Sequence, residues 1–154
     1  MHSKNQITSL QSIIIFLLIT CSAQTLRAKS VYVITNTEAG TVNSYDIQDD
    51  QIHYQATAEN LQRNLAIGLA LDPDSETIFI TYEDSDIIEM VNAKMMISEQ
   101  NPVKVTGADN LAGIAFDCEK QKLYVVDRRT YKLFVYLWDP VDKTLTLGAC
   151  PSNT

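Results

Sequence analysis

The chain has few of the residues from which common catalytic and metal sites are built. Its 154 residues include two histidines, three cysteines and one tryptophan. The motifs GxSxG, GxGxxG, HExxH and GxxxxGK[ST] are absent, so no signature of a nucleophile elbow, a dinucleotide loop, a zinc protease helix or a phosphate loop is present. His53 is the one histidine outside the N-terminal segment, which excludes a zinc site built on two or three histidines there. A Ser-His-Asp triad would have to use His53, but the alternating segment around it, QIHYQAT, favours a surface strand. We therefore predict no catalytic residues.

Basic residues are also scarce. The chain has 12 Lys and Arg against 19 Asp and Glu. The first thirty residues contain three of the basic residues and no acid, so the remainder carries nine basic and nineteen acidic residues. Because an acidic body repels phosphate backbones, we expect no nucleic-acid partner.

No apolar run is long enough to cross a membrane. The run IIIFLLIT covers residues 13–20, whereas a membrane span needs about 20 apolar residues. A polar start with one cation precedes this run and small residues follow it, which is typical of a secretory signal peptide. We therefore expect residues 1–30 to be a signal peptide, cleaved after Ala23 or Ser30, and the protein to be secreted, periplasmic or at the cell surface. An uncleaved signal or a lipid on Cys21 would give membrane contact.

Two sequence elements recur in the same order. GLALD at 68–72 returns as GIAFD at 113–117, 45 residues later. IFI at 78–80 returns as LYV at 123–125, again after 45 residues, and VYVIT at 31–35 is a third copy of this second element. Two elements that recur at one period indicate an internal structural repeat.

Each repeat is predicted to contain about four short antiparallel strands. The apolar runs alternate with period 2, are rich in β-branched and aromatic residues, and are separated by turn residues such as Pro73 and Asp74. The segment 101–107, NPVKVTG, supplies a further strand. Four antiparallel strands in 40–50 residues form the blade of a β-propeller. The predicted fold class is therefore all-β, a β-propeller-type repeat of four-stranded antiparallel blades.

The repeats divide the chain into units. We assign a repeat domain to residues 31–147 and a C-terminal tail to 148–154. The domain consists of a partial, three-stranded blade at 31–57 and full blades at 65–107 and 111–147. These eleven strands amount to about two and three-quarter blades, whereas propellers typically have 4–8. We therefore expect an incomplete propeller: a truncated reading frame, a ring closed between chains, or an open stack whose exposed edges favour association.

The repeats resemble a known family. LAGIAFDCEKQKLYVVDRRTYKLFVYLWD (111–139) and LAIGLALDPDSETIFITYEDSDIIEMVN (65–92) are similar to the YVTN/NHL-type β-propeller repeats of exported prokaryotic proteins. The resemblance covers nearly all of the chain after the signal and implies further blades that this chain does not contain. It specifies the architecture and not the activity, because such repeats scaffold many unrelated functions.

Two cysteines remain outside the proposed signal, Cys118 and Cys150. An even pair in an oxidising compartment permits one disulfide, which would tie the turn of the last blade to the C-terminal tail. Two free thiols are the alternative. No CxxC motif is present, so neither redox catalysis nor a cysteine zinc site is supported.

Acidic clusters are the remaining candidates for a metal site. Asp72 and Asp74, and Asp84 and Asp86, place several oxygen ligands within a few residues, as calcium prefers. Neither cluster matches an EF-hand loop. The competing interpretation is that these side chains cap turns between strands. Calcium is thus the one cofactor that the sequence admits.

Charged residues of opposite sign occupy equivalent loops. Arg128 and Arg129, with Lys132 nearby, stand 45 residues after Glu83 and Asp84. Equivalent loops of neighbouring blades lie side by side, so these residues can form ion pairs between blades or between chains. Exposed pairs would contribute little stability.

Aromatic residues recur inside the predicted strands. Tyr32, Phe79, Tyr124, Tyr136 and Trp138 occupy such positions. A ligand-stacking platform is one interpretation. Packing between neighbouring blades is the interpretation we favour, because equivalent strand positions of a propeller face the same layer between blades.

Two hypotheses of function follow. The first is an exported, noncatalytic binding or scaffold module that recognises a protein partner or associates with itself through open blade edges. The second is a fragment of a lactonase- or esterase-like propeller enzyme, for which Asp72, Asn110 and Asp117 would have to converge on one metal ion. A nonfunctional truncated reading frame is a third possibility.

Overall fold

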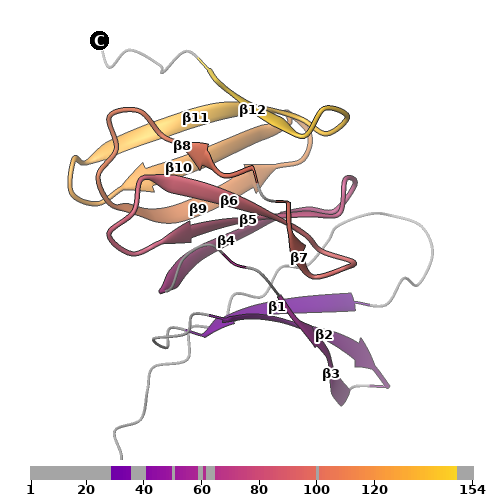
Figure 1. The fold of residues 1–154 in the computed structure, drawn as a ribbon. Coiled ribbons are helices and arrows are strands. Elements are labelled where there is room, and N and C mark those ends of the chain that lie inside the picture. The colour runs from indigo at the N-terminus through magenta and orange to yellow at the C-terminus, as the bar shows by residue number, and fades with distance from the viewer. Residues whose placement is uncertain are drawn as a thin grey trace, which may run out of the picture.

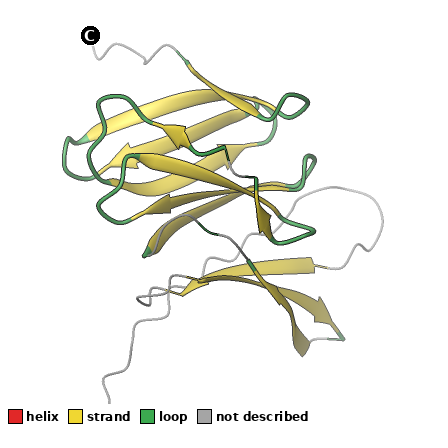
Figure 2. Ribbon diagram, viewed as in Figure 1, coloured by secondary structure: helices red, strands yellow, loops and turns green. Residues whose placement is uncertain are grey.

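The fold is all-β, as predicted. The computed structural model describes residues 29–35, 41–49, 51–58, 61, 65–99 and 101–148. These residues form twelve β-strands in three antiparallel sheets (Figures 1 and 2). Nearly all of the proposed signal peptide, together with Cys21, Cys150 and the tail after Gly148, lies outside the described residues. Among the residues that the structure describes, no helix is long and apolar enough to span a membrane.

Each sheet corresponds to one unit of the sequence. The first sheet has the order β1-β2-β3, with β1 (Lys29–Thr35), β2 (Thr41–Gln48) and β3 (Gln51–Thr57). The second has the order β4-β5-β6-β7, with β4 (Ala66–Asp72), β5 (Thr77–Tyr82), β6 (Ile87–Asn92) and β7 (Ile97–Ser98), and β8 (Val103–Lys104) also pairs with β6. The third has the order β9-β10-β11-β12, with β9 (Leu111–Asp117), β10 (Lys122–Asp127), β11 (Lys132–Asp139) and β12 (Thr144–Leu147).

The outer edge of the second sheet differs from the prediction. One strand was expected within 101–107, but β6 pairs with two strands of two residues each, β7 and β8. Pro102 directly precedes β8 and has no N–H to donate to a ladder, which explains why pairing is interrupted there. The described residues therefore form twelve strands where the sequence predicts eleven.

The second sheet is buried on both faces. Along β5 every residue is buried, although successive side chains point to opposite faces. Ile78, Ile80 and Tyr82 pack with Tyr32 and Ile34 of the first sheet. The side chain of Phe79, which lies between Ile78 and Ile80 in the sequence, points to the other face and packs with Leu123, Val125 and Trp138 of the third sheet. The first and third sheets thus lie on opposite sides of the second, as stacked blades of a propeller do (Figure 1).

Five of the turns between strands share one chemistry. A carboxylate or amide side chain at the end of a strand accepts the backbone N–H two residues on, and in all but the first of the turns also the N–H three residues on: Asp72, Asn92, Asp117, Asp127 and Asp139. The residue four positions after each has positive φ: Glu76, Met96, Gln121, Tyr131 and Lys143. None of these residues is glycine, so each turn keeps an unfavourable backbone conformation for an L-residue.

This strain predicts a stabilising substitution. Tyr131 has φ 55° and its side chain is 92% exposed. Tyr131→Gly relieves the left-handed strain at little cost in contacts, so we expect the free energy of unfolding to rise by about 0.5–1 kcal/mol. Thr130→Gly, next to it and without positive φ, is expected to lower the stability. Urea denaturation of both variants checks this, and a loss of stability in Tyr131→Gly would contradict the role of the turn.

Candidate functional site

The candidate metal residues are distributed over both ends of the inner strands. β4 packs beside β9, and Asp72 and Asp117 end these two strands. Asn110 precedes β9 and therefore lies at the opposite end, about 20 Å away along a strand of this length. The structure does not bring Asp72, Asn110 and Asp117 to one point.

The carboxylate of Asp72 links the second sheet to the third by a hydrogen bond. It is buried, and its Oδ2 accepts the indole N–H of Trp138 at 2.9 Å and the hydroxyl of Ser75 at 2.5 Å. Its Oδ1 accepts the backbone N–H of Asp74 at 3.2 Å. Both oxygens therefore serve structural hydrogen bonds. Asp74 itself is exposed on the turn.

The second pair of candidate acids is held by basic and amide groups. The Asp84 carboxylate accepts hydrogen bonds from Asn110 Nδ2 at 2.6 Å and from Arg129 at 3.1 Å. Asp86 forms an ion pair with Lys104 at 3.2 Å. In the part of the chain that the structure describes, no three His, Cys, Asp or Glu side chains are grouped so that they could hold a metal ion.

The loops that are 45 residues apart do meet. Arg128 forms an ion pair with Glu83 at 2.6 Å, and Arg129 pairs with Asp84 at 3.1 Å and with Asp109 at 2.9 Å. These contacts join the second and third sheets as the sequence predicts. The partners are about half exposed, so their contribution to stability is small.

Asp127, at the end of β10, has both carboxylate oxygens engaged by backbone hydrogen bonds. It is fully buried. Its Oδ2 accepts the backbone N–H groups of Asp109 and Asn110, at 2.6 and 2.7 Å, and its Oδ1 those of Arg129 and Thr130, at 2.9 and 2.6 Å. Burial by itself would raise the pKa of this carboxyl, but the N–H donors outweigh burial and hold the pKa well below its usual range. Sequence reasoning missed this role, because Asp127 looks like any other turn aspartate.

A second buried carboxylate lies within the second sheet. Glu89 of β6 is buried and accepts hydrogen bonds from the hydroxyls of Tyr82 and Ser98. Burial, followed by the hydrogen bond to Glu89, raises the pKa of Tyr82, so the phenol remains a proton donor. These three side chains are buried, and their hydrogen bonds link β5, β6 and β7 of the second sheet.

The predicted aromatics mostly pack between sheets. Tyr32 belongs to the core between the first and second sheets, and Phe79, Tyr136 and Trp138 belong to the core between the second and third. The rings of Phe79 and Trp138 meet edge to face, with centroids 5.0 Å apart. Tyr124 is the exception, because it is partly exposed on the face of the third sheet that is turned away from the second.

His53 and Cys118 show no catalytic environment. His53 lies exposed on β3. Cys118 is exposed on the turn between β9 and β10, and its proposed disulfide partner Cys150 is outside the described residues. Partial burial, together with the nearby carboxylates of Asp72 and Asp74, raises the pKa of the Cys118 thiol. A protonated thiol is a weak nucleophile.

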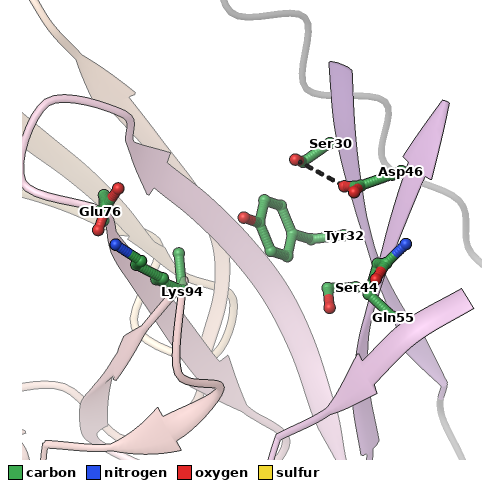
Figure 3. Close-up of a pocket in the computed structure, with 8 residues that line it drawn as sticks. Ser30, Tyr32, Ser44, Asp46, Gln55, Glu76 and Lys94 are labelled. Carbon is green, nitrogen blue, oxygen red and sulfur yellow. Dashed lines mark hydrogen bonds between the residues drawn. The ribbon is translucent and has the colours of Figure 1, made fainter. Parts of the chain in front are cut away.

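A polar cleft lies between the first and second sheets (Figure 3). Its volume is about 350 Å³. The side chains that line it come from separate strands and turns: Ser30, Tyr32, Ser44 and Asp46 on one side, and Glu76 and Lys94 on the other. The Ser30 hydroxyl donates to Asp46 at 3.2 Å, and burial raises the pKa of Tyr32, so its phenol stays protonated. These groups can hydrogen-bond a small polar ligand, but they form no pair of nucleophile and base.

No linear pattern in the sequence pointed to this cleft. Its residues come from β1, β2 and β3 of the first sheet and from two hairpin turns of the second sheet. Their proximity depends on how the first sheet sits against the second. That relation is a tertiary one, and neither strand periodicity nor turn chemistry encodes it.

Comparison with known proteins identifies the fold. No protein-family model matches the chain, and no curated protein matches it. Among solved structures, it is similar to hydrazine synthase of Kuenenia stuttgartiensis, with a TM-score of 0.60 and 14% identity over 77% of this chain and 31% of that one. It is also similar to a candidate 6-phosphogluconolactonase of Bacteroides fragilis, with a TM-score of 0.60 and 17% identity over 77% of this chain and 34% of that one.

A third similar structure is the nidogen–laminin complex, with a TM-score of 0.56 and 21% identity over 80% of this chain and 45% of that one. The chain has a propeller-like fold. It spans between about a third and less than half of the length of these three solved structures. Similarity at this level of identity shows the fold and leaves the activity open.

Proposed function

We propose that this protein is an exported, noncatalytic propeller-type module that binds a protein partner. The observation that carries the proposal is the outer face of the third sheet. Val126, Leu133 and Leu137 on this face are 45%, 43% and 46% exposed. A contiguous apolar face on a sheet is typical of a surface that another protein covers.

The acidic residues support the noncatalytic half of the proposal. Asp72 and Asp127 are engaged by donors that hold neighbouring strands and turns together, and Asp84 and Asp86 are paired with basic or amide groups. A calcium ion would have to displace these donors. Three of the four candidate ligands, Asp72, Asp84 and Asp86, thus take part in turns, in ion pairs or in contacts between sheets.

The export that we propose rests on the apolar run at 13–20 and on the small residues after it. The acidic surface of the remaining chain suits a module that meets other proteins rather than nucleic acid.

A second candidate function is that of a lactonase-like metal enzyme. It is favoured by the similarity to the candidate 6-phosphogluconolactonase. Asp74 is the candidate ligand whose side chain is exposed on a turn, and Asp84 is the one whose side chain is most accessible at the opposite end, at 68%.

Calcium and substrate assays separate the two functions. For the binding module, we expect no hydrolysis of a panel of sugar lactones and no change in the melting temperature when calcium or a chelator is added. The control variants are Asp74→Asn and Asp84→Asn, which should behave as the parent does toward calcium. Hydrolysis of a lactone, together with a rise in melting temperature with calcium that either variant removes, would establish the enzyme and overturn the proposal.

A further inference from the structure

The three sheets present equivalent side chains in the same direction. The strand pairs β1–β2, β5–β6 and β10–β11 are equivalent in the three sheets. At the same position of each pair, two residues lie opposite one another: Tyr32 and Ser44, Phe79 and Met90, and Tyr124 and Val135. Tyr32 is buried against the second sheet, and Phe79 and Met90 are buried against the third. The face of the third sheet that carries Tyr124 is therefore the equivalent of two faces that are each covered by a following sheet of this same chain.

Two glycines show this equivalence at the backbone. Gly68 and Gly113 are 45 residues apart and occupy the same position of β4 and β9. A Cβ at Gly68 would collide with the carbonyl oxygen of Ala112, in the neighbouring inner strand. A Cβ at Gly113 would meet no atom within 4 Å. Gly113 thus repeats a glycine whose purpose in the second sheet is to let the next inner strand approach closely.

The first sheet carries the complementary face. In the second and third sheets, the positions that face the preceding sheet are apolar: Ile78, Ile80 and Val91, and Leu123, Val125 and Tyr136. Their equivalents in the first sheet, by strand register, are Val31, Val33 and Tyr45. These side chains alternate with Tyr32 and Ile34 and so lie on the face away from the second sheet. Val31 is buried, whereas Val33 and Tyr45 are partly exposed.

The described residues therefore carry both halves of a contact between sheets, one at each end of the stack of three sheets. We propose that a second copy of this chain binds here, with the first sheet of each copy covering the Tyr124 face of the third sheet of the other. This proposal rests on the proposed function and names its protein partner. Two different surfaces that meet in this way form a heterologous contact, which becomes a closed assembly when the rotation between copies closes. Two copies with three sheets each place six sheets in the ring, within the 4–8 blades of propellers.

The test measures the mass of the full chain by sedimentation equilibrium over a range of concentrations. We expect a dimer. Gly113→Val and Val126→Lys should each raise the dissociation constant at least about 100-fold, the first by blocking the approach of a strand and the second by burying an unpaired charge. A Cβ at Gly113 meets no atom within 4 Å and Val126 is 45% exposed, so we expect little change in the thermal unfolding of the monomer.

Two controls make the result specific. Val141→Lys, on the turn between β11 and β12 and 88% exposed, should leave the dimer intact. Val33→Lys damages the other half of the contact and should also yield monomers. A mixture of Val33→Lys and Gly113→Val copies retains one undamaged contact, so the mixture should form a dimer where neither variant does alone.

The outcomes separate the alternatives. A parent chain that stays monomeric at every concentration, or a dimer that Gly113→Val and Val126→Lys leave unchanged, would overturn the proposal. Failure of the mixture to dimerise would also overturn it, because the mixed dimer keeps one pair of undamaged faces. Dimers of Val33→Lys alone would indicate instead a contact between two third sheets. An open series of larger oligomers would overturn the two-copy ring. Lactone hydrolysis by an intact dimer would instead refute the noncatalytic function and leave the contact standing.

Discussion

Asp127→Asn is expected to lower the free energy of unfolding by about 2–3 kcal/mol, although the side chain keeps its size. The two carboxylate oxygens of Asp127 accept four backbone N–H groups, two from the segment before β9 and two from the turn after β10. Asparagine offers one oxygen, so its NH₂ group would face two N–H donors in a buried site. Each buried donor that loses its acceptor costs about 1–3 kcal/mol. Urea denaturation at neutral pH measures the loss.

The matched control is Asp139→Asn. Asp139 has the same place in the turn after β11, where its Oδ1 accepts the N–H groups of Val141 and Asp142, and its side chain is exposed. Asn92 performs this task in the second sheet with its single oxygen, so we expect a loss below about 0.5 kcal/mol. Equal losses in the two variants would show that Asp127 is an ordinary turn residue.

The pH dependence provides an independent readout of the same carboxylate. Its folded pKa lies below the value near 4 of an unfolded aspartate. A group whose pKa is lowered by folding contributes stability above its unfolded pKa, and that stability is lost as the pH falls toward the folded pKa. The difference in stability between the parent and Asp127→Asn should therefore be constant from pH 7 to about 5 and should shrink below about pH 4. A difference that does not change with pH would contradict the lowered pKa.

Local patterns in the sequence were enough to predict three antiparallel sheets and most of their strands. The repeat of GLALD and GIAFD located the inner strands β4 and β9. The repeat of VYVIT, IFI and LYV placed Tyr32, Phe79 and Tyr124 at equivalent positions. The spacing of 45 residues also predicted that Arg128 and Arg129 lie beside Glu83 and Asp84. These features depend on periodicity, which is a property of the linear chain.

Contacts between side chains at non-equivalent positions of the repeats were not predictable. Asp72 receives the indole N–H of Trp138, which is 66 residues away, and no spacing rule connects an aspartate of one turn to a side chain of the next sheet. For the same reason, sequence patterns offered calcium as an alternative to turn capping for Asp72. The division of the second sheet's edge into β7 and β8 depends on a proline next to a two-residue strand, a detail finer than strand prediction resolves.

The pair Gly68 and Gly113 gives the sharpest test of how the sheets stack. A methyl group at Gly68 would collide with the Thr81 hydroxyl and the Ala112 carbonyl oxygen and would lie 3.0 Å from Ile114. Thr81 donates its hydroxyl hydrogen to that carbonyl at 2.8 Å, so Gly68→Ala pushes β4 away from β9 and breaks this hydrogen bond. We expect the free energy of unfolding to fall by about 3 kcal/mol, from the combined costs of overpacking and of the lost hydrogen bond.

Gly113→Ala is the same change at the equivalent position of the next sheet, where the added Cβ would meet no atom within 4 Å. Measured at a protein concentration low enough for the monomer, it should leave the stability unchanged or raise it by up to about 1 kcal/mol, because alanine has less backbone freedom to lose than glycine. The two substitutions differ in whether a neighbouring sheet occupies the space, and Gly68 also faces the Thr81 hydroxyl of its own sheet. A loss in Gly113→Ala as large as that in Gly68→Ala would mean that the third sheet is already covered within a single copy. If only Gly68→Ala lowers the free energy of unfolding, the loss measures the cost of filling the space beside the inner strand. At Gly113, a second copy occupies the equivalent space in the proposed dimer.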